Sequence, residues 1–517
     1  MRYFLAFSYN MHDSSVSIAD EERVLLVLEA ERFFGEKKKR CDHREMEALI
    51  GAALDYCGIG IGDVDGVACT AYLNDHLPES QRDLEWLAET EIEILGSKRE
   101  TLVLNHHLAH AAMVHAFPGT GGNDDVVIDV CDGGGDFGQT HFTYRCRDRR
   151  IEQLANRPIH DVFSTRFYDV VARHLYGRIM CEGKLMALAS LGEPRQEMIA
   201  FMRDHLPTFN GDGPEHGLAV LRAAFPIESY LTSRIAFDLA ASAQDLLEEL
   251  RVESVVALPK DASRVMLAGG ATLNIKANAR VKAVLGPSRE LLLPPCCDDT
   301  GQSLGALLYF CHERAHLPVT CPMPFLGHGD GILDDKLGAP DRTDEIVSFL
   351  ANEGIVFLHR GASEIGPRAL GHRSILARPT RKSFDIINHV IKQREFYRPL
   401  APIVPIESAS RWFDWEGASP YMLYAARVSQ RTRLEAPGVC HYDDSARLQT
   451  VDRADDPFLH AVLTNLEQST GCPLLINTSL NPRGVPILST IQSTRRFASS
   501  LRELGVRVFS GDSLEKA

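Results

Sequence analysis

Two largely apolar runs end abruptly in glycine-rich turns, and this pattern limits the fold more than any other feature of the chain. Val126–Val130 runs into Cys131-Asp132-Gly133-Gly134-Gly135-Asp136, and Val265–Ala268 runs into Gly269-Gly270. Short apolar runs of this kind are typical of strands buried on both faces of a sheet. Glycine after such a strand lets the backbone approach a ligand closely, although it also occurs in turns for steric reasons alone. The pattern predicts an α/β domain that binds a nucleotide.

Other segments extend this prediction along the chain. Strands are expected at residues 3–7, 15–18, 24–29 and 355–358, and helices at 44–57 and 235–256. A chain of 517 residues is too long for one ordinary hydrophobic core, and a region rich in Pro and Asp separates its two halves. We therefore predict a first domain at 1–325, a linker at 326–344 and a second α/β domain at 345–517.

The charge and the cysteines exclude several classes of partner and location. The formal net charge of −15 repels the phosphates of nucleic acids and anionic membranes, so neither is expected as a partner. No apolar stretch is long enough to span a bilayer, and residues 3–7 indicate a first strand rather than a signal peptide. The 12 cysteines are scattered and form no CxxC pair, which favours a reduced, cytoplasmic protein.

Basic residues in the second half predict a local site for an anion. They lie in the runs Glu364–Ser374, with Arg368, and Lys392–Pro399, with Arg398. Guanidinium groups match the geometry of phosphate oxygens. A lone basic run would indicate a solvated surface. Here Pro, Gly and apolar residues alternate with the charges, which favours a pocket.

The same region carries a family resemblance. It lies in two segments, Glu364-Ile365-Gly366-Pro367-Arg368-Ala369-Leu370-Gly371-His372-Arg373-Ser374 and Asn477-Thr478-Ser479-Leu480-Asn481-Pro482-Arg483-Gly484-Val485-Pro486-Ile487. Both resemble signature segments of the O-carbamoyltransferases of nodulation-factor and antibiotic biosynthesis, and matching motifs run from residue 12 to residue 487. The resemblance implies an N-terminal domain of the actin-like ATPase and sugar-kinase type, similar to threonylcarbamoyl transferases, and a C-terminal YrdC-like α/β domain. Leu480 replaces the family's usual Phe, Val485 its usual Glu, and Arg360 a frequent Gln.

A histidine pair predicts a metal site. His106 and His110 stand four residues apart, so on a helix both imidazoles point the same way, although such pairs also arise by chance. The resemblance adds Asp132 and Asp299 as the other two ligands, with the neighbouring Asp298 as an alternative to Asp299. Mixed nitrogen and oxygen ligation suits Fe(II), Mn or Zn, and Fe(II) is the first expectation.

Groups near the glycine turns are expected to bind the nucleotide, whose phosphates the backbone N–H groups would cradle. Asn274 follows the second turn and matches a polar position of the family, although it also fits a helix N-cap. The expected nucleotide-binding residues of the first domain are Gly133, Gly134, Gly269, Gly270 and Asn274.

Three residues are expected to take part in catalysis. Lys184 matches a family position at which a cation lies near the nucleotide. His12 follows the first strand and is expected to orient or deprotonate the acceptor hydroxyl, with an ordinary turn histidine as the alternative. Asp238 is an acid on an otherwise apolar helical segment, and its alternative is a structural hydrogen bond to a neighbouring loop.

The second domain is expected to bind two polyanions, carbamoyl phosphate and ATP, which requires several cations to offset their mutual repulsion. The resemblance implies that carbamoyl phosphate is bound by Arg368, Lys392, Arg398, Arg447 and Arg483, and that the ATP phosphates are contacted by Asn477, Ser479 and Asn481. The basic run Lys37–Arg40 is expected to lie on a solvated loop, and we assign it no role.

These features predict an ATP-dependent O-carbamoyltransferase of secondary metabolism. The second domain would convert carbamoyl phosphate and ATP into carbamoyl-adenylate, and the first, metal-bearing domain would transfer the carbamoyl group to a hydroxyl. The acceptor is expected to be a sugar, aminoglycoside, β-lactam or polyketide-type metabolite, bound by residues 70–100 and 200–232. A tRNA- or protein-directed carbamoylating enzyme and a non-catalytic nucleotide-binding module are the alternatives. A homodimer is compatible with the sequence.

Overall fold

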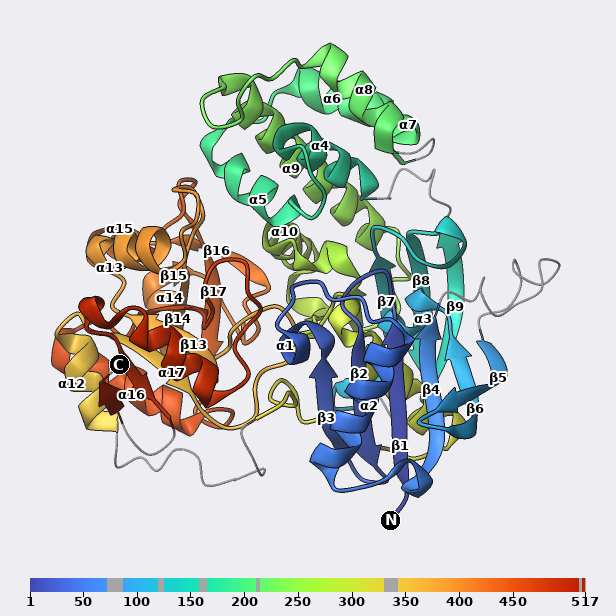
Figure 1. Cartoon of the computed structure of the whole chain (residues 1–517). Coiled ribbons are helices and arrows are strands. Elements are labelled where there is room, and N and C mark those ends of the chain that lie inside the picture. Colours follow the sequence, from blue (N-terminus) through green and yellow to red (C-terminus); the bar gives the residue numbers. More distant parts are fainter. Residues whose placement is uncertain are drawn as a thin grey trace. The chain divides into compact units, whose positions relative to one another are not determined.

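The computed structural model describes residues 1–71, 87–119, 125–157, 165–210, 214–329, 343–510 and 514–516 (Figure 1). The chain divides into two compact units, of which the first comprises Met1–Ala30 and Lys38–Met323 and the second Glu31–Lys37 and Pro324–Ala517. The sequence did not indicate that Glu31–Lys37 belongs to the second unit. Most of the predicted linker, residues 330–342, lies outside the described residues, and the predicted domain boundaries stay predictions.

The first unit contains a six-stranded sheet in the order β3-β2-β1-β4-β6-β5. Its strands are β1 (Tyr3–Tyr9), β2 (Ser15–Asp20), β3 (Val24–Glu29), β4 (Val64–Ala71), β5 (Leu87–Ile94) and β6 (Ser97–Leu104). β1 pairs antiparallel with β2 and parallel with β4. Helix α2 (His43–Cys57) packs on β2 and β3, and α11 (Gln302–Tyr309) packs on β1, β2 and β4.

Helix α2 shows how local sequence defines these elements. Asp42 and Glu45 form a reciprocal capping box at its start, which satisfies N–H groups that the first turn leaves free. Gly58 ends the helix in the left-handed conformation, which glycine adopts without steric cost. Its buried side chains include Met46, Leu49 and Ile50, a spacing of three and four residues that places them on the face toward the sheet.

A second sheet of the first unit has the order β11-β10-β7-β8-β9. Its strands are β7 (Val126–Cys131), β8 (His141–Arg147), β9 (Arg150–Arg157), β10 (Arg264–Ala268) and β11 (Glu290–Leu292). β7 and β10 run parallel with Val130 opposite Ala268, so the two glycine turns leave the same edge of the sheet. The predicted α/β class is confirmed, whereas the actin-like label for the first domain stays a prediction.

Helices fill the remainder of the first unit, and several of them pack against the long helix α9 (Figure 1). These helices are α3 (His106–Ala112), α4 (Arg166–Tyr176), α5 (Glu182–Leu188), α6 (Gln196–Asp204), α7 (Leu206–Asn210), α8 (Pro214–Ala224), α9 (Arg234–Val256) and α10 (Ile275–Leu285). Helix α1 (Ala30–Phe34) lies almost entirely in the segment that belongs to the second unit.

One charged residue interrupts the apolar run of β7. The fully buried Asp129 carboxylate lies 2.7 Å from an Arg251 guanidinium nitrogen and 2.6 Å from His141 Nε2. Burial alone would raise the pKa of Asp129, but these partners hold it well below the usual range. Since Arg251 belongs to α9, the ion pair ties this helix to β7 three residues before Asp132.

The second unit is built on a mixed sheet in the order β15-β16-β17-β14-β18-β13-β12-β19-β20. Its strands are β12 (Ile355–His359), β13 (Arg373–Ala377), β14 (Ala401–Pro405), β15 (Phe413–Asp414), β16 (Tyr424–Val428), β17 (Ser445–Val451), β18 (Leu475–Ser479), β19 (Arg507–Phe509) and β20 (Leu514–Lys516). Its other helices are α12 (Thr343–Ala351), α13 (Arg381–Asp385), α14 (Ala409–Trp412), α15 (Gln430–Glu435), α16 (Pro457–Thr470) and α17 (Ile491–Ser499).

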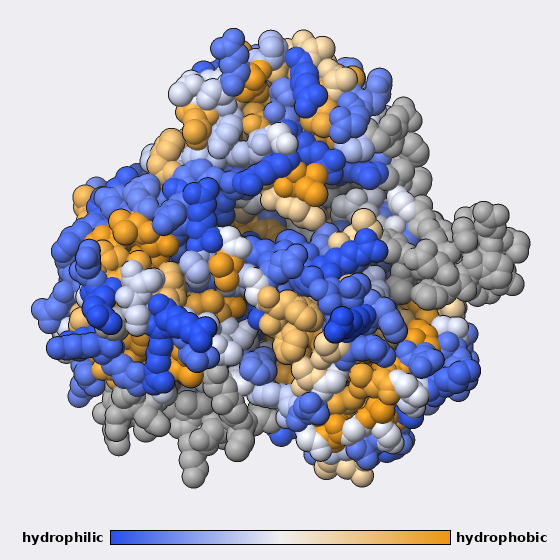
Figure 2. Space-filling model, viewed as in Figure 1, coloured by the Kyte–Doolittle hydropathy of each residue, from blue (hydrophilic) through white to orange (hydrophobic). Residues whose placement is uncertain are grey.

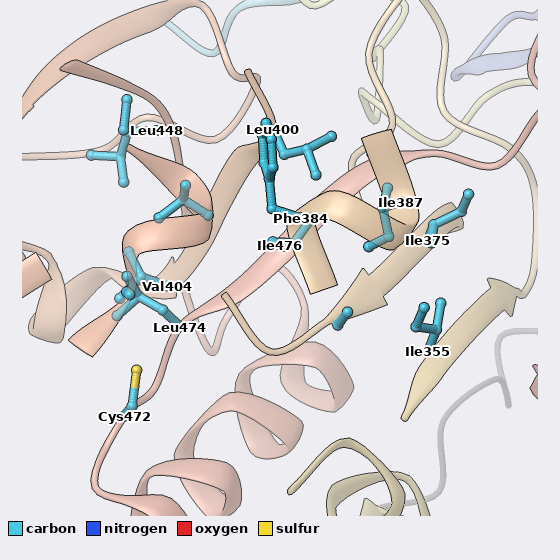
Figure 3. Close-up of a cluster of buried hydrophobic side chains, with 14 of the residues drawn as sticks. Ile355, Ile375, Phe384, Ile387, Leu400, Val404, Leu448, Cys472, Leu474 and Ile476 are labelled. Carbon is cyan, nitrogen blue, oxygen red and sulfur yellow. The ribbon is translucent and has the colours of Figure 1, made fainter. Parts of the chain in front are cut away.

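Both faces of this sheet are buried. Ile355 and Phe357 of β12 enter one hydrophobic cluster, part of which Figure 3 shows, whereas Val356 and Leu358 enter another. Alternate residues of a strand point to opposite faces, so a strand covered on both sides needs an uninterrupted apolar run. This explains the run at 355–358. The YrdC-like label for this unit stays a prediction.

The visible surface carries scattered hydrophobic residues among hydrophilic ones (Figure 2). Among the helices of the described residues, we find none that is both long and apolar enough to cross a membrane.

Gly305 offers a test of the packing in the first unit. A Cβ atom at this position of α11 would lie 1.9 Å from the Ala109 carbonyl oxygen of α3. Gly305→Ala must push the two helices apart and is expected to lower the free energy of unfolding by about 1–3 kcal/mol, measured by urea denaturation. Gly51→Ala is the control, because a Cβ there meets nothing within 4 Å and helical Ala is favoured over Gly by about 0.5–1 kcal/mol. Equal stability of Gly305→Ala and wild type would contradict this packing.

Candidate functional site

Helix α3 presents two imidazoles toward one point. Asn105 caps the helix by accepting the N–H groups of His107 and Leu108, and Asp136 accepts the N–H group of His106 at 2.7 Å. His106 and His110 lie one turn apart, with ring centroids separated by 4.9 Å. His107 points away from them and packs against Phe142, with the two ring centroids 4.5 Å apart.

The structure brings together the four residues predicted to hold a metal. One ligand atom each from His106, His110, Asp132 and Asp299 lies within 4.8 Å of the others. His110 Nε2 is 3.4 Å from Asp132 Oδ2 and 3.3 Å from Asp299 Oδ1. The neighbouring Asp298 lies outside this cluster and instead accepts the Thr300 hydroxyl at 2.5 Å.

The chemistry of this cluster fits a divalent cation. Among the described residues, neither His106 Nε2 nor His110 Nε2 has a hydrogen-bond partner, although both are buried. Burial opposes a positive charge on His110, yet the carboxylates of Asp132 and Asp299 raise its pKa to about 9. Two carboxylates therefore favour a positive charge between them, and two imidazole nitrogens complete a donor set suited to Fe(II), Mn or Zn.

Glycine N–H groups hold the Asp132 carboxylate in place. Gly133 donates to Asp132 Oδ1 and Gly270 to Asp132 Oδ2, both at 2.6 Å, and Gly134 lies 3.4 Å from Oδ1. Gly269, with φ of 87°, leaves no room for a Cβ atom beside the Cys131 carbonyl. In this structure the N–H groups of Gly133, Gly134 and Gly270, predicted to cradle phosphates, thus orient a candidate metal ligand.

A second layer of charge lies beside Asp299. His12 Nδ1 is 2.9 Å from Asp13 Oδ2 and 3.6 Å from Asp299 Oδ2. Lys38 Nζ donates to Asp13 Oδ2 at 2.6 Å. The basic run Lys37–Arg40 was expected to be solvated and was assigned no role. Lys38 is exposed as expected, but sequence reasoning did not predict its contact with Asp13. The only local signal for Lys38 is its position in a run of four basic residues, and such a run does not show which acidic residue one of them will contact.

Two other predicted site residues make structural contacts. Asp238 accepts the Glu193 N–H and the Arg195 Nε–H, both at 2.9 Å, which is the loop contact that the sequence left as its alternative. Asn274 caps α10 by accepting the Ala277 N–H at 3.1 Å, and its amide pairs with Gln244. Lys184 lies on α5 with its Nζ 5.8 Å from the centre of the Tyr176 ring.

The second unit gathers guanidinium groups within electrostatic reach of one another. Burial, followed by repulsion from Arg368, Arg394 and Arg398, lowers the pKa of Arg447 well below its usual value. Burial, followed by repulsion from Arg398 and Arg368, lowers the pKa of Arg394 to about 9. Like charges held together in this way favour a bound anion. Arg394 was not among the predicted site residues, although it lies in the predicted basic run.

Lys392 and the predicted ATP-binding residues hold the loops of this site. Lys392 Nζ is buried and donates to Ser479 O at 2.5 Å, to Asn481 O at 2.9 Å and to Asn481 Oδ1. Burial lowers the pKa of Lys392 well below its usual value. Asn477 donates to Gln449 at 2.7 Å and to Ala369 O at 3.2 Å, which joins its strand to the Arg368 loop.

The segment Asn477–Ile487 contains two further predicted site residues, Arg483 and Asn481. Arg483 is exposed, in contrast to Lys392. Asn481 donates to the backbone carbonyl of Val485, a contact that does not depend on which side chain occupies position 485.

Comparison with known proteins decides the family. The models described as Carbamoyltransferase N-terminus and Carbamoyltransferase C-terminus match residues 88–308 and 347–507. Nodulation protein NolO of Bradyrhizobium diazoefficiens is 32% identical over 75% of this chain and 74% of its own length. The chain belongs to the carbamoyltransferase family.

Further relatives of this carbamoyltransferase include nodulation protein NolNO of Sinorhizobium fredii, which is 28% identical over 93% of this chain and 76% of its own length. Among solved structures, HypF of T. kodakarensis aligns over 61% of this chain and 48% of its own, at 13% identity and a TM-score of 0.35. That similarity is too low to carry an argument. The family identifies the protein as a transferase enzyme, which excludes the non-catalytic module considered above.

The metal assignment can be tested with the purified carbamoyltransferase. Loss of a residue that merely supports a metal ligand costs about 10–100-fold in affinity, so loss of a ligand is expected to cost about 100-fold or more. His110→Ala should therefore lose Fe(II), Mn(II) and Zn(II) binding, measured by metal content after desalting and by chelator competition. His107→Gln, on the same helix but outside the cluster, should keep its metal. Full metal content in His110→Ala would remove His110 from the site.

Proposed function

We propose that this carbamoyltransferase activates carbamoyl phosphate with ATP in its second unit and transfers the carbamoyl group to a hydroxyl in its first. The observation that carries the proposal is the presence of two sites of opposite charge preference in one chain. The cluster of His106, His110, Asp132 and Asp299 favours a cation, whereas the cluster of Arg368, Arg394, Arg398 and Arg447 favours an anion.

In the second unit the guanidinium groups bind the phosphates of carbamoyl phosphate and ATP and offset their mutual repulsion. Water first cleaves the bond between the carbamoyl oxygen and the phosphorus of carbamoyl phosphate, which releases inorganic phosphate and leaves carbamate. A carbamate oxygen then attacks the α-phosphorus of ATP, the bond from that phosphorus to the bridging β-phosphate oxygen breaks, and pyrophosphate leaves. Lys392 keeps the Ser479–Asn481 loop beside this site, since its Nζ donates hydrogen bonds to Ser479 O and Asn481 O.

In the first unit the acceptor hydroxyl attacks the carbamoyl carbon, and AMP leaves. A bound divalent metal would polarise the carbonyl group and offset the negative charge that develops on its oxygen. His106, His110, Asp132 and Asp299 would hold this metal, with Fe(II) as the first expectation. His12 lies beside Asp299 and is placed to orient the hydroxyl or receive its proton.

The acceptor is a hydroxylated small molecule such as a sugar or another secondary metabolite, and the protein acts in the cytoplasm. Similarity to nodulation proteins supports this class of acceptor. Of the stretches predicted to bind it, residues 72–86 and 211–213 lie outside the described residues.

Activation is tested by pyrophosphate release from ATP, with and without carbamoyl phosphate, in the presence of Fe(II) and hydroxylated acceptors. Release is expected to require carbamoyl phosphate and to be accompanied by inorganic phosphate. The proposed activation chemistry would be overturned by pyrophosphate release at the same rate with and without carbamoyl phosphate. It would also be overturned if no pyrophosphate were released under any of these conditions.

The division of labour is tested with two variants. Arg368→Ala removes a cation from the anion site and is expected to slow pyrophosphate release by about 100-fold or more. His110→Ala should leave that release largely intact while abolishing carbamoyl transfer to the acceptor, measured by mass spectrometry of the product. If His110→Ala lost activation and kept transfer, the roles of the two units would be reversed.

A further inference from the structure

The segment Glu31–Lys37 belongs to the second unit, although the residues on both sides of it belong to the first. Its two ends are fixed within the first unit. Ala30 donates its N–H group to Ser14 O, and Ser14 donates its own to Lys39 O, both at 2.9 Å. The intervening residues form a loop that starts with α1 and contributes to the second unit far upstream of the rest of that unit.

Arg32 of this loop reaches the turn that precedes Arg368 in the second unit. Its side chain is buried and donates three times to one turn. One terminal nitrogen donates to Glu364 O and to Ser363 Oγ at 3.3 Å, and the other donates to Gly366 O at 2.5 Å. A guanidinium presents its donors in a rigid planar fork, so two carbonyl oxygens bound in this way are fixed relative to each other.

The turn that Arg32 grips directly precedes Arg368. Gly366 has φ of 85°, a conformation that favours glycine and lets the chain reverse here. On the far side of Arg368, the buried Glu364 carboxylate accepts the Leu370 N–H at 2.6 Å. Arg32 and Glu364 therefore fix the backbone on both sides of the residue that carries the cation.

We propose that Arg32 is a positioning residue of the anion site: it holds the Ser363–Gly366 turn so that the Arg368 guanidinium meets the phosphate oxygens of the ligand. The proposal rests on the proposed function of the second unit. It means that this site is completed by a residue 332 positions upstream of Glu364 in the chain. Arg32 itself binds carbonyl oxygens and need not touch the ligand.

The experiment compares full-length wild type, Arg32→Ala and Arg32→Lys. Affinity for carbamoyl phosphate is measured by calorimetry, and pyrophosphate release is measured against carbamoyl phosphate concentration. Arg32→Ala is expected to raise Kd and KM for carbamoyl phosphate at least tenfold. Arg32→Lys should recover little, because an ammonium group cannot donate along the two fixed directions of the fork. Added guanidinium chloride at millimolar concentration should restore part of the affinity of Arg32→Ala, which a purely structural defect would not allow.

Arg40→Ala is the matched control, because Arg40 lies just beyond the Glu31–Lys37 loop, is exposed, and donates to Met11 Sδ at 3.9 Å rather than to the Ser363–Gly366 turn. It should bind carbamoyl phosphate like wild type. Unchanged Kd and KM in Arg32→Ala would overturn the proposal, as would a loss that follows a fall in melting temperature and resists guanidinium. If wild type binds carbamoyl phosphate but releases no pyrophosphate, the proposed function fails while the calorimetry still decides the role of Arg32. If wild type does not bind carbamoyl phosphate, both proposals fall.

Discussion

Helices α3 and α11 pack backbone against backbone, and the geometry of the first site depends on this contact. Gly305 of α11 lies so close to the Ala109 carbonyl that no larger residue fits between them. Gln302, at the start of α11, donates its amide to His106 O at 3.1 Å. One helix carries both imidazoles, and the other begins at Gln302, directly after the turn Asp299–Gly301. A wider separation would therefore move the Asp299 carboxylate away from both rings.

Buried charged side chains fix the backbone near both candidate sites. Asp129 and Arg251 form an ion pair inside the first unit, which joins α9 to the strand that leads to Asp132. The Glu364 carboxylate accepts backbone N–H groups of the loop that carries Arg368. A buried charge is stable only when paired or hydrogen-bonded, so each of these groups holds its partners at a defined distance. The positions of Asp132 and Arg368 thus depend on buried charged groups, Asp129 with Arg251 and Glu364, whose role here is structural.

Much of the site could be predicted from the sequence because its signals are local. The spacing of His106 and His110 implies a shared helix face, and the apolar runs predicted the two strands that end in glycine turns. The register of β7 with β10 then places these two turns at the same edge of the sheet. Asp238 and Asn274 show the limit of such reasoning. A polar residue at an unusual position fits a catalytic role and a structural one equally well, and only the identity of its partners separates them.

By itself the sequence determined the α/β class, the strands that end in glycine turns, the histidine pair and the basic runs, since each follows from spacing and residue type over a few turns or strands. Only the tertiary structure decided that Asp299 and not Asp298 joins the histidines, that Lys38 reaches Asp13, and that Arg32 grips a turn near Arg368. These contacts join residues far apart in the chain. Periodicity describes one element at a time, whereas the packing of several elements selects which distant side chains meet.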